Sequence, residues 1–244
     1  MDKDLLELER KHLGQLILET DEANFDKVCE SFLIVYTYDA VGMEGKNKIP
    51  YEDVKRLLHT KTLLDYSERE QKEILNHAEA YHHVYKKAKA NQPLDEEILK
   101  DIHEMLVKDI FQGGVYRNVN IQIKGGMHQP PDYVKVYDRM NKYFQTLEQY
   151  KNDPIEKAVF AHASLAKIHP FLDGNGRLAR LVMNYILIQN NYLPISIPID
   201  LRSQYIKHLE TFKVEKELKP LVVFIKELLL KRYLDVAKKL EESA

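Results

Sequence analysis

Glycine is scarce in this chain, and its placement restricts the fold more than any other feature of the sequence. The chain has 244 residues and only 9 glycines. Apart from Gly14, the glycines fall in three clusters, within 42–45, 113–126 and 174–176. Because glycine weakens helices and collects where the backbone turns or approaches a ligand, the clusters mark three special backbone sites. The stretches between them are free to form long helices.

These stretches carry the pattern of amphipathic helices, with apolar residues recurring every three and four positions. Asp153-Pro154 and Lys219-Pro220 are typical helix starts, since proline suits the first turn. We therefore predict an all-α fold in a single domain over 1–244. The expected helices cover 67–90, 95–109, 132–151, 155–168, 176–190 and 219–241.

One stretch favours β structure. The sequence VYRNVNIQI at 115–123 is rich in β-branched residues and is followed by Lys124-Gly125-Gly126. Strand-forming residues that lead into glycines are typical of a hairpin. We predict a short β-hairpin flap over about 113–127, between two helices.

Charge and cysteine content narrow the classes of partner. The chain has 36 Lys and Arg against 38 Asp and Glu, so it has no general attraction to nucleic acid or anionic membranes. Cys29 is the only cysteine, which excludes an internal disulfide and a multi-cysteine metal site and fits a reducing compartment. The acidic start does not resemble a signal peptide, and no long apolar run follows. We expect a cytoplasmic protein with no membrane and no direct nucleic-acid partner.

The segment IHPFLDGNGRLAR, residues 168–180, combines the third glycine cluster with groups that carry chemistry. Gly174-Asn175-Gly176 can adopt backbone angles that make successive N–H groups converge, and such a nest at a helix start binds anions such as phosphate. Asp173 would repel phosphate unless a divalent cation bridged the two, and Mg²⁺ is normally held by carboxylates together with phosphate oxygens. These residues predict a site for a nucleotide with Mg²⁺.

Three further side chains of this segment suit transfer of a phosphate-containing group. Arg177, in the first helical turn, can bind a phosphate through two N–H groups, and Arg180 follows one turn later on roughly the same face. His169 is a side chain that can accept a proton from a hydroxyl at neutral pH. Taken singly, each feature is more often structural. The whole combination has a chance frequency on the order of 10⁻¹⁰ per starting position, so we interpret it as a functional site.

The segment HPFLDGNGRLAR matches in full the signature HxFx(D/E)GNGRxxR of the Fic (filamentation induced by cAMP) family, and the chain resembles that family from about residue 30 to 210. GVYR at 114–117, IKGGMHQPP at 123–131 and RSQY at 202–205 resemble the family's flap and C-terminal core. The resemblance implies a Fic fold, which is all-α with a β-hairpin flap.

The resemblance further implies a protein adenylyltransferase, which transfers AMP from ATP, with Mg²⁺, to a Ser, Thr or Tyr hydroxyl of a target protein or of the enzyme itself. In this role His169 is the general base, Asp173 is the Mg²⁺ ligand and Phe171 holds the loop in place. The residues implied to bind the nucleotide are Gly174, Asn175, Gly176, Arg177, Arg180 and Tyr205.

The expected flap strand, residues 115–124, offers an edge that can pair with an extended target segment. Its candidate docking residues are Tyr116, Arg117 and Lys124. The alternative is a structural hairpin that only closes over the core.

Glu44-Gly45 matches the second half of the family's inhibitory motif (S/T)xxxE(G/N), with Ala40 where the family has Ser or Thr. The resemblance implies an inhibitory helix region at about 24–45, whose glutamate pairs with the second arginine of the signature. We therefore expect a salt bridge between Glu44 and Arg180. It would occupy a phosphate partner and place negative charge where the γ-phosphate would lie.

Several alternatives stay open. The donor can instead be UTP, CDP-choline or a source of plain phosphate, and Glu44 can support removal of AMP. A non-catalytic alternative is a nucleotide-sensing regulator or toxin–antitoxin partner, although the intact His169, Asp173 and Arg177 argue against it. The C-terminal helix at 219–241 either packs on the domain or forms a homo-oligomer contact.

Overall fold

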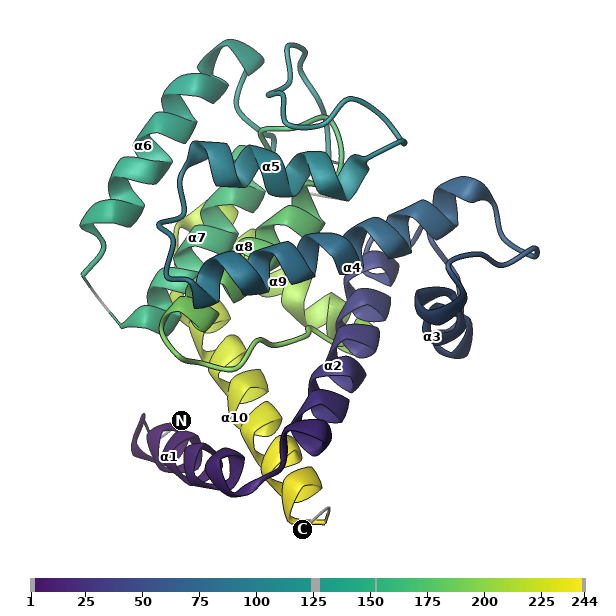
Figure 1. Ribbon diagram of the computed structural model, residues 1–244. Helices are drawn as coiled ribbons and strands as arrows, with labels where there is room; N and C mark the ends of the chain where they lie inside the picture. Colours follow the sequence, from purple (N-terminus) through teal and green to yellow (C-terminus); the bar gives the residue numbers. More distant parts are fainter. Residues whose placement is uncertain (1–2, 124–127, 152, 243–244) are drawn as a thin grey trace.

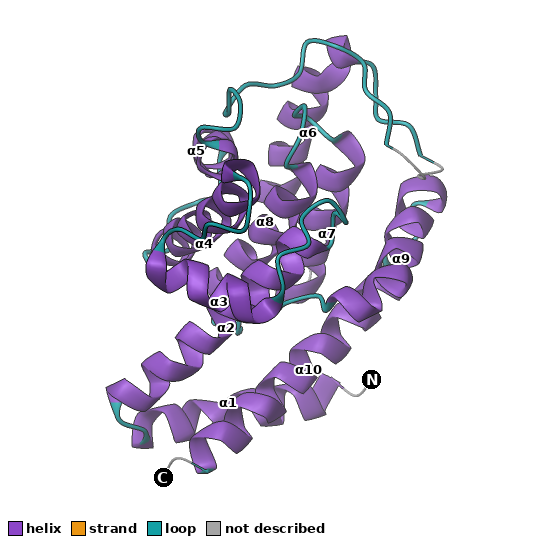
Figure 2. Cartoon of the chain, turned by 90° about the vertical axis from the view of Figure 1, so that its right-hand side faces the viewer, coloured by secondary structure: helices purple, strands orange, loops and turns teal. Residues whose placement is uncertain are grey.

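The computed structural model describes residues 3–123, 128–151 and 153–242, and in these residues the chain is built from helices joined by loops (Figure 1, Figure 2). The α-helices are α1 Lys3–Glu19, α2 Glu22–Gly42, α3 Tyr51–Thr60, α4 Glu68–Lys89, α5 Glu96–Val107, α6 Val136–Gln149, α7 Pro154–Ile168, α8 Asn175–Gln189, α9 Arg202–Glu215 and α10 Lys219–Glu241. Short 3-10 turns at Tyr133–Lys135 and Ile199–Leu201 lead into α6 and α9.

Helix α8 runs through the middle of the fold because it is apolar on most of its faces. Every residue from Arg177 to Ile188 is buried. The helix packs against α7, α4, α5 and α2, and in Figure 1 it lies beside α7, behind α4 and α5. Its first turn, which carries the Gly-Asn-Gly segment, is therefore anchored in the packed core.

Helix α2 connects two distant parts of the fold. Figure 1 shows it rising from the lower tip, near α1 and the end of α10, towards α4. It packs on α3, α4 and α10 and reaches α8. There, Nη2 of Arg180 donates to the carbonyl oxygen of Ala40 at 2.7 Å. This contact fixes the C-terminal end of α2, so that residues 43–47 emerge beside the start of α8.

The predicted helices are confirmed to within a few residues as α4, α5, α6 with its preceding turn, α7, α8 and α10. The carboxylate of Asp153 accepts hydrogen bonds from the backbone N–H groups of Ile155 and Glu156, and Pro154 begins α7 as predicted. Proline also lies in the first turn of α10. Proline and its cap therefore mark these helix starts correctly.

The predicted β-hairpin is wrong for the described part of the flap. Residues 115–123 form an irregular loop without a strand, and 124–127 lie outside the described residues. The guanidinium of Arg117 donates to the carbonyl oxygens of Val119 and Pro131. Because this buried side chain bonds backbone carbonyls on both arms of the flap, those carbonyls do not join a strand ladder.

Two expectations from composition can be compared with the structure. Cys29, on α2, carries a free thiol. In the described ranges, no helix combines the length and the apolar character that crossing a membrane requires.

The start of α4 tests how much a helix cap contributes to the stability of the fold. Ser67 and Glu70 form a capping box: the hydroxyl of Ser67 accepts from the Glu70 N–H at 3.3 Å, and the Glu70 carboxylate accepts from the Ser67 N–H at 3.1 Å. We expect Ser67→Ala to lower the free energy of unfolding by about 1 kcal/mol in urea denaturation. Ser31→Ala, in the middle of α2, is the control and should change it by no more than about 0.5 kcal/mol. Equal effects of the two substitutions would contradict the capping assignment.

Candidate active site

The loop between α7 and α8, residues 169–174, which we call the catalytic loop, is held in place by hydrogen bonds to neighbouring residues of the same segment. His169 ends α7 with a φ of 53°, and its N–H donates to the carbonyl oxygen of Leu165 at 2.9 Å. The side-chain amide of Asn175 accepts from the N–H of Phe171 and donates to its carbonyl, each at 2.9 Å. Phe171 is fully buried, as its expected role requires. The side chain of Asn175 is thus used within the loop, and its backbone N–H, in the first turn of α8, is left for a partner outside the helix.

His103, on α5, is a site residue that sequence reasoning misses. Its ring stacks on Phe171, with the ring centroids 3.7 Å apart. The N–H of Gly114 donates to Nδ1 at 3.0 Å, so the ring proton lies on Nε2, which donates to the carbonyl oxygen of Asp173 at 3.0 Å. Burial lowers the pKa of His103 to about 4, which keeps this neutral tautomer at pH 7. His103 therefore ties the beginning of the flap to the catalytic loop.

Two glycines of the motif are required by backbone angle and by space. Gly174 has a φ of +75°, and a Cβ there would lie 3.3 Å from Cγ1 of Val107. A Cβ on Gly176 would lie 3.3 Å from Nη1 of Arg180 and 3.6 Å from Oε1 of Glu44. The first N–H groups of a helix have no partner within that helix, and they carry a partial positive charge. The start of α8 therefore has the backbone geometry and partial positive charge that suit an anion.

His169 has the properties of a general base. Burial, aided by the charges of Lys213 and Arg117, lowers its pKa from 6.5 to about 4. The ring is therefore neutral at pH 7. Its Nδ1 lies 3.4 Å from the carbonyl oxygen of Ala166, which favours a proton on Nδ1 and leaves Nε2 as the proton acceptor.

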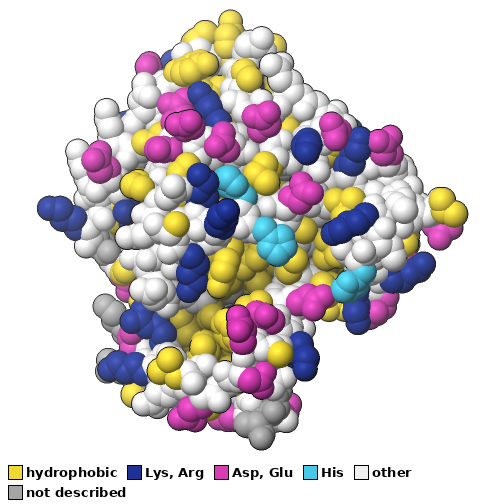
Figure 3. All heavy atoms as spheres, viewed as in Figure 1, with side chains coloured by type: hydrophobic (Ala, Val, Ile, Leu, Met, Phe, Trp, Pro, Cys, Tyr) yellow, Lys and Arg dark blue, Asp and Glu magenta, His cyan; other side chains and the backbone are white. Residues whose placement is uncertain are grey.

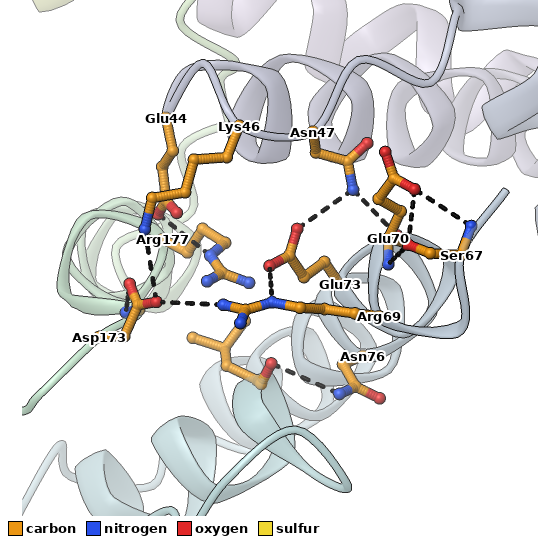
Figure 4. A network of polar contacts seen from close by, with 12 residues as sticks. Glu44, Lys46, Asn47, Ser67, Arg69, Glu70, Glu73, Asn76, Asp173 and Arg177 are labelled. Carbon is orange, nitrogen blue, oxygen red and sulfur yellow. Dashed lines mark hydrogen bonds and ion pairs between the residues drawn. The ribbon is translucent and has the colours of Figure 1, made fainter.

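The carboxylate of Asp173 has the surroundings expected of a Mg²⁺ ligand. Its Oδ1 accepts from the Gly174 N–H at 2.8 Å, and its Oδ2 lies 3.7 Å from Nζ of Lys46 and 3.6 Å from Nη2 of Arg69 (Figure 4). Burial raises the pKa of Asp173, but the Gly174 N–H and the charges of Lys46, Arg177 and Arg69 outweigh burial and hold it below its ordinary value. The part of the chain that the structure describes holds no cluster of three or more His, Cys, Asp or Glu side chains able to bind a metal. Mg²⁺ would therefore be held by Asp173 together with phosphate oxygens.

Glu44 reaches the start of α8 as expected, but its partner is Arg177. Its Oε1 accepts from Nε of Arg177 at 3.1 Å (Figure 4). The expected pairing with Arg180 is wrong, because Arg180 lies one turn deeper in α8 and donates to a backbone carbonyl of α2. The Arg177 side chain is only 2% exposed, and its Nη1 has no hydrogen-bond partner among the described residues. A buried donor without a partner is one that a bound phosphate can satisfy.

Arg180 and Tyr205, which the resemblance implies as nucleotide-binding residues, both lie in the core. The hydroxyl of Tyr205 pairs with Nε2 of His162 at 2.9 Å. Burial lowers the pKa of His162 to about 3, so this pair is neutral. The structure therefore places Tyr205 behind the site, where it supports the packing of α7 and α9, and not on the surface of the loop.

Tyr116 and Arg117 are not the exposed edge residues that the expected strand implies. Both are buried, and the ring of Tyr116 packs on Phe171 with centroids 5.3 Å apart. The Nε of Arg117 donates to the carbonyl oxygen of His169 at 2.9 Å. Both residues hold the flap segment against the catalytic loop. Lys124, the third candidate, lies outside the described residues.

Sequence reasoning also misses the two cations that face Asp173. Lys46 follows Glu44 by two residues, so its charge beside the inhibitory motif was a local signal. Arg69 lies on α4, and nothing near it in the sequence indicates a site. It is directed by Glu73, whose carboxylate lies 3.4 Å from its Nε and also accepts from Asn47 at 3.2 Å (Figure 4).

The chain is similar in sequence to known proteins. Residues 93–187 match the model of the Fic/DOC family. The chain is 30% identical over 233 residues to the protein adenylyltransferase Fic of Drosophila grimshawi, an alignment that covers 92% of this chain and 47% of that protein. The chain thus spans less than half the length of that relative.

Two solved structures have the same fold. One is a Fic domain containing signaling protein from Bacteroides thetaiotaomicron, with a TM-score of 0.88, 22% identity and 98% of each chain covered. The other is a Fic protein from C. elegans, with a TM-score of 0.86, 20% identity and 99% of this chain and 73% of that chain covered.

The state of His169 can be measured directly. We expect its ring to titrate near pH 4, because burial disfavours the charged form and lowers the pKa from 6.5. Its neutral form should thus dominate at pH 7 and be lost only as the pH falls towards about 4. NMR titration of the ring carbon-bound protons measures this, and His169→Ala assigns the signal. A midpoint at 6 or above would contradict the lowered pKa and with it the neutral form of His169.

Proposed function

From the Fic domain that this chain contains, we propose that the protein is an adenylyltransferase that transfers AMP from ATP to a Ser, Thr or Tyr hydroxyl of a protein target or of itself. The name of its Drosophila relative supports the class of reaction. The observation that carries the proposal is the half-buried His169, neutral at pH 7, which lies four residues before Asp173 and at the other end of the loop from the first turn of α8.

The start of α8 binds the phosphates of ATP in this proposal. The free N–H groups of Asn175, Gly176 and Arg177 face outward from the first turn, where the helix dipole favours negative charge. Arg177 adds a guanidinium with an unpartnered nitrogen, within reach of the same turn. Mg²⁺ on Asp173, when bound, supplies positive charge that neutralises the phosphates.

The transfer step follows from these positions. The hydroxyl oxygen of the target attacks the α-phosphorus, and its proton passes to Nε2 of His169. A bond forms between that oxygen and phosphorus, the bond from phosphorus to the pyrophosphate oxygen breaks, and pyrophosphate leaves with its electron pair. The chain's contribution is to hold the reacting groups in line and to stabilise charge on the leaving pyrophosphate through Arg177 and the N–H groups of α8.

Autoinhibition is the second part of the proposal. The segment after α2 places the carboxylate of Glu44 on Arg177 and the ammonium of Lys46 on Asp173, at 3.1 Å and 3.7 Å (Figure 4). The carboxylate therefore stands in for a phosphate, and the ammonium for a metal ion. With both partners taken and Arg177 covered, a nucleotide must displace this segment before its phosphates reach the arginine.

Labelling with radioactive ATP tests the proposal. We expect Glu44→Gly to raise AMP incorporation about tenfold or more, because a hydrogen bond between charged groups contributes ~1.5–3 kcal/mol. His169→Ala in the Glu44→Gly background should abolish incorporation, since the base is lost. Glu217→Gly, in the exposed loop between α9 and α10, is the matched control and should resemble the wild type. UTP and CDP-choline, tested in parallel, identify the donor.

Label that persists without His169 would remove it as the base. Activity of Glu44→Gly at or below the wild-type level, with folding intact, would refute the brake. Loss of preloaded AMP from a labelled protein, dependent on Glu44, would assign the reverse reaction to this glutamate.

The contribution of Lys46 can be separated from that of Glu44. In the His169→Ala background, which prevents turnover, we expect Lys46→Met to tighten binding of Mg²⁺–ATP about two- to fivefold, because an exposed ion pair contributes only ~0.2–1 kcal/mol. Isothermal titration calorimetry measures the affinity. Lys48→Met, an exposed lysine of the same segment, is the control. Weaker binding after Lys46→Met would show that Lys46 holds phosphate and does not compete for Asp173.

A further inference from the structure

An apolar cavity of about 780 Å³ lies beside the catalytic loop, on the side of Asp173 and Arg69. We call it the loop-side cavity. Its apolar walls come from the flap segment, the start of α6 and the catalytic loop, and include Val115, Tyr116, Tyr133, Val134, Tyr137 and Leu172.

The apolar side chains that line the loop-side cavity are unusually exposed to solvent. Val115, Tyr133, Val134, Tyr137 and Leu172 are each between 40% and 62% exposed. Apolar side chains scattered singly over a surface need no explanation, but a contiguous group around a hollow marks an interaction site. The location of this group, next to the proposed reaction centre, makes the target the natural occupant.

Leu172 makes the cavity continuous with the reaction centre. It lies between the buried Phe171 and Asp173, and it is three residues from His169. Three residues of chain span at most about 11 Å. The backbone of Leu172, and with it one wall of the cavity, therefore lies within about 11 Å of the backbone of His169, and two or three residues of an extended peptide cover about 7–10 Å at roughly 3.3 Å each.

The flap segment that borders the cavity is suited to an extended partner. Residues 118–123 make no backbone-to-backbone hydrogen bond with any other described residue. A peptide that pairs with such a segment gains affinity from its main chain, and pockets for its side chains supply the specificity.

The charged groups that line the cavity already have partners, so they favour an uncharged guest. Arg69 and Asp173, at one end, face each other at 3.6 Å. Arg117 donates to the carbonyl oxygens of His169, Val119 and Pro131. The other polar groups of the lining are the neutral side chains Gln112 and Asn118 and the tyrosine hydroxyls.

We propose that the loop-side cavity receives a large apolar side chain of the target, such as Phe, Tyr, Leu or Met, two or three residues from the modified hydroxyl in an extended segment. This inference rests on the proposed adenylyltransferase function and names the feature by which that site selects its substrate.

A peptide library tests the cavity. Each peptide carries one Tyr, Thr or Ser acceptor between randomised positions and is incubated with the Glu44→Gly protein, ATP and Mg²⁺, after which mass spectrometry reads the AMP-bearing sequences. We expect large apolar residues to be enriched about tenfold, two or three positions from the acceptor, in line with the burial of one such side chain. Val134→Asp, and independently Val115→Asp on the opposite wall, should remove the enrichment. Leu234→Asp, at an exposed leucine of α10, is the matched control and should leave it unchanged.

The other outcomes separate the two proposals. Labelled peptides without an apolar preference, or with a preference that both cavity variants retain, overturn the cavity and leave AMP transfer standing. Self-labelling without any labelled peptide overturns recognition of an extended segment. Absence of both self-labelling and peptide labelling in the Glu44→Gly protein refutes the transferase itself, and the inference with it.

Discussion

The fixed position of the start of α8 is the constraint on which the whole site depends. A helix that is buried along its length provides a rigid support, and its first turn offers N–H groups that no other part of the helix can satisfy. Asn175 binds the loop back onto the helix through two bonds to Phe171, and His103 holds the other side of the loop through the carbonyl of Asp173. The proposed base and the first turn of α8 therefore have little freedom to rearrange.

The segment after α2 matches this site in charge at two points. Glu44 pairs with Arg177, and Lys46 pairs with Asp173 (Figure 4). Both signs of charge are therefore paired when this segment lies on the site. The pairs differ in environment, since Arg177 is buried whereas Lys46 is largely exposed. The contact of Glu44 should accordingly dominate the energy of closure, and Lys46 should contribute a smaller, salt-sensitive part.

Most helices could be predicted from apolar periodicity and proline caps, because these depend on neighbours in sequence. The motif also singled out His169, Asp173 and Arg177 as candidates, because their spacing is local. The sequence could not show that residues 115–123 form no strand, because this depends on the Arg117 guanidinium, which donates to carbonyl oxygens that a strand ladder would use. The partner of Glu44 and the role of His103 depend on contacts between segments 133 and 70 residues apart. The spacing of apolar residues along the chain does not indicate which arginine Glu44 contacts.

We propose above that the carboxylate of Glu44 occupies the place of an ATP phosphate at the start of α8. A crystal structure of the Glu44→Gly protein with Mg²⁺ and a non-hydrolysable ATP analogue tests it most directly. We expect a terminal phosphate to contact Arg177 and the first N–H groups of α8, with the α-phosphorus facing His169. A nucleotide bound elsewhere, with Arg177 still buried and the start of α8 free of phosphate, would contradict it.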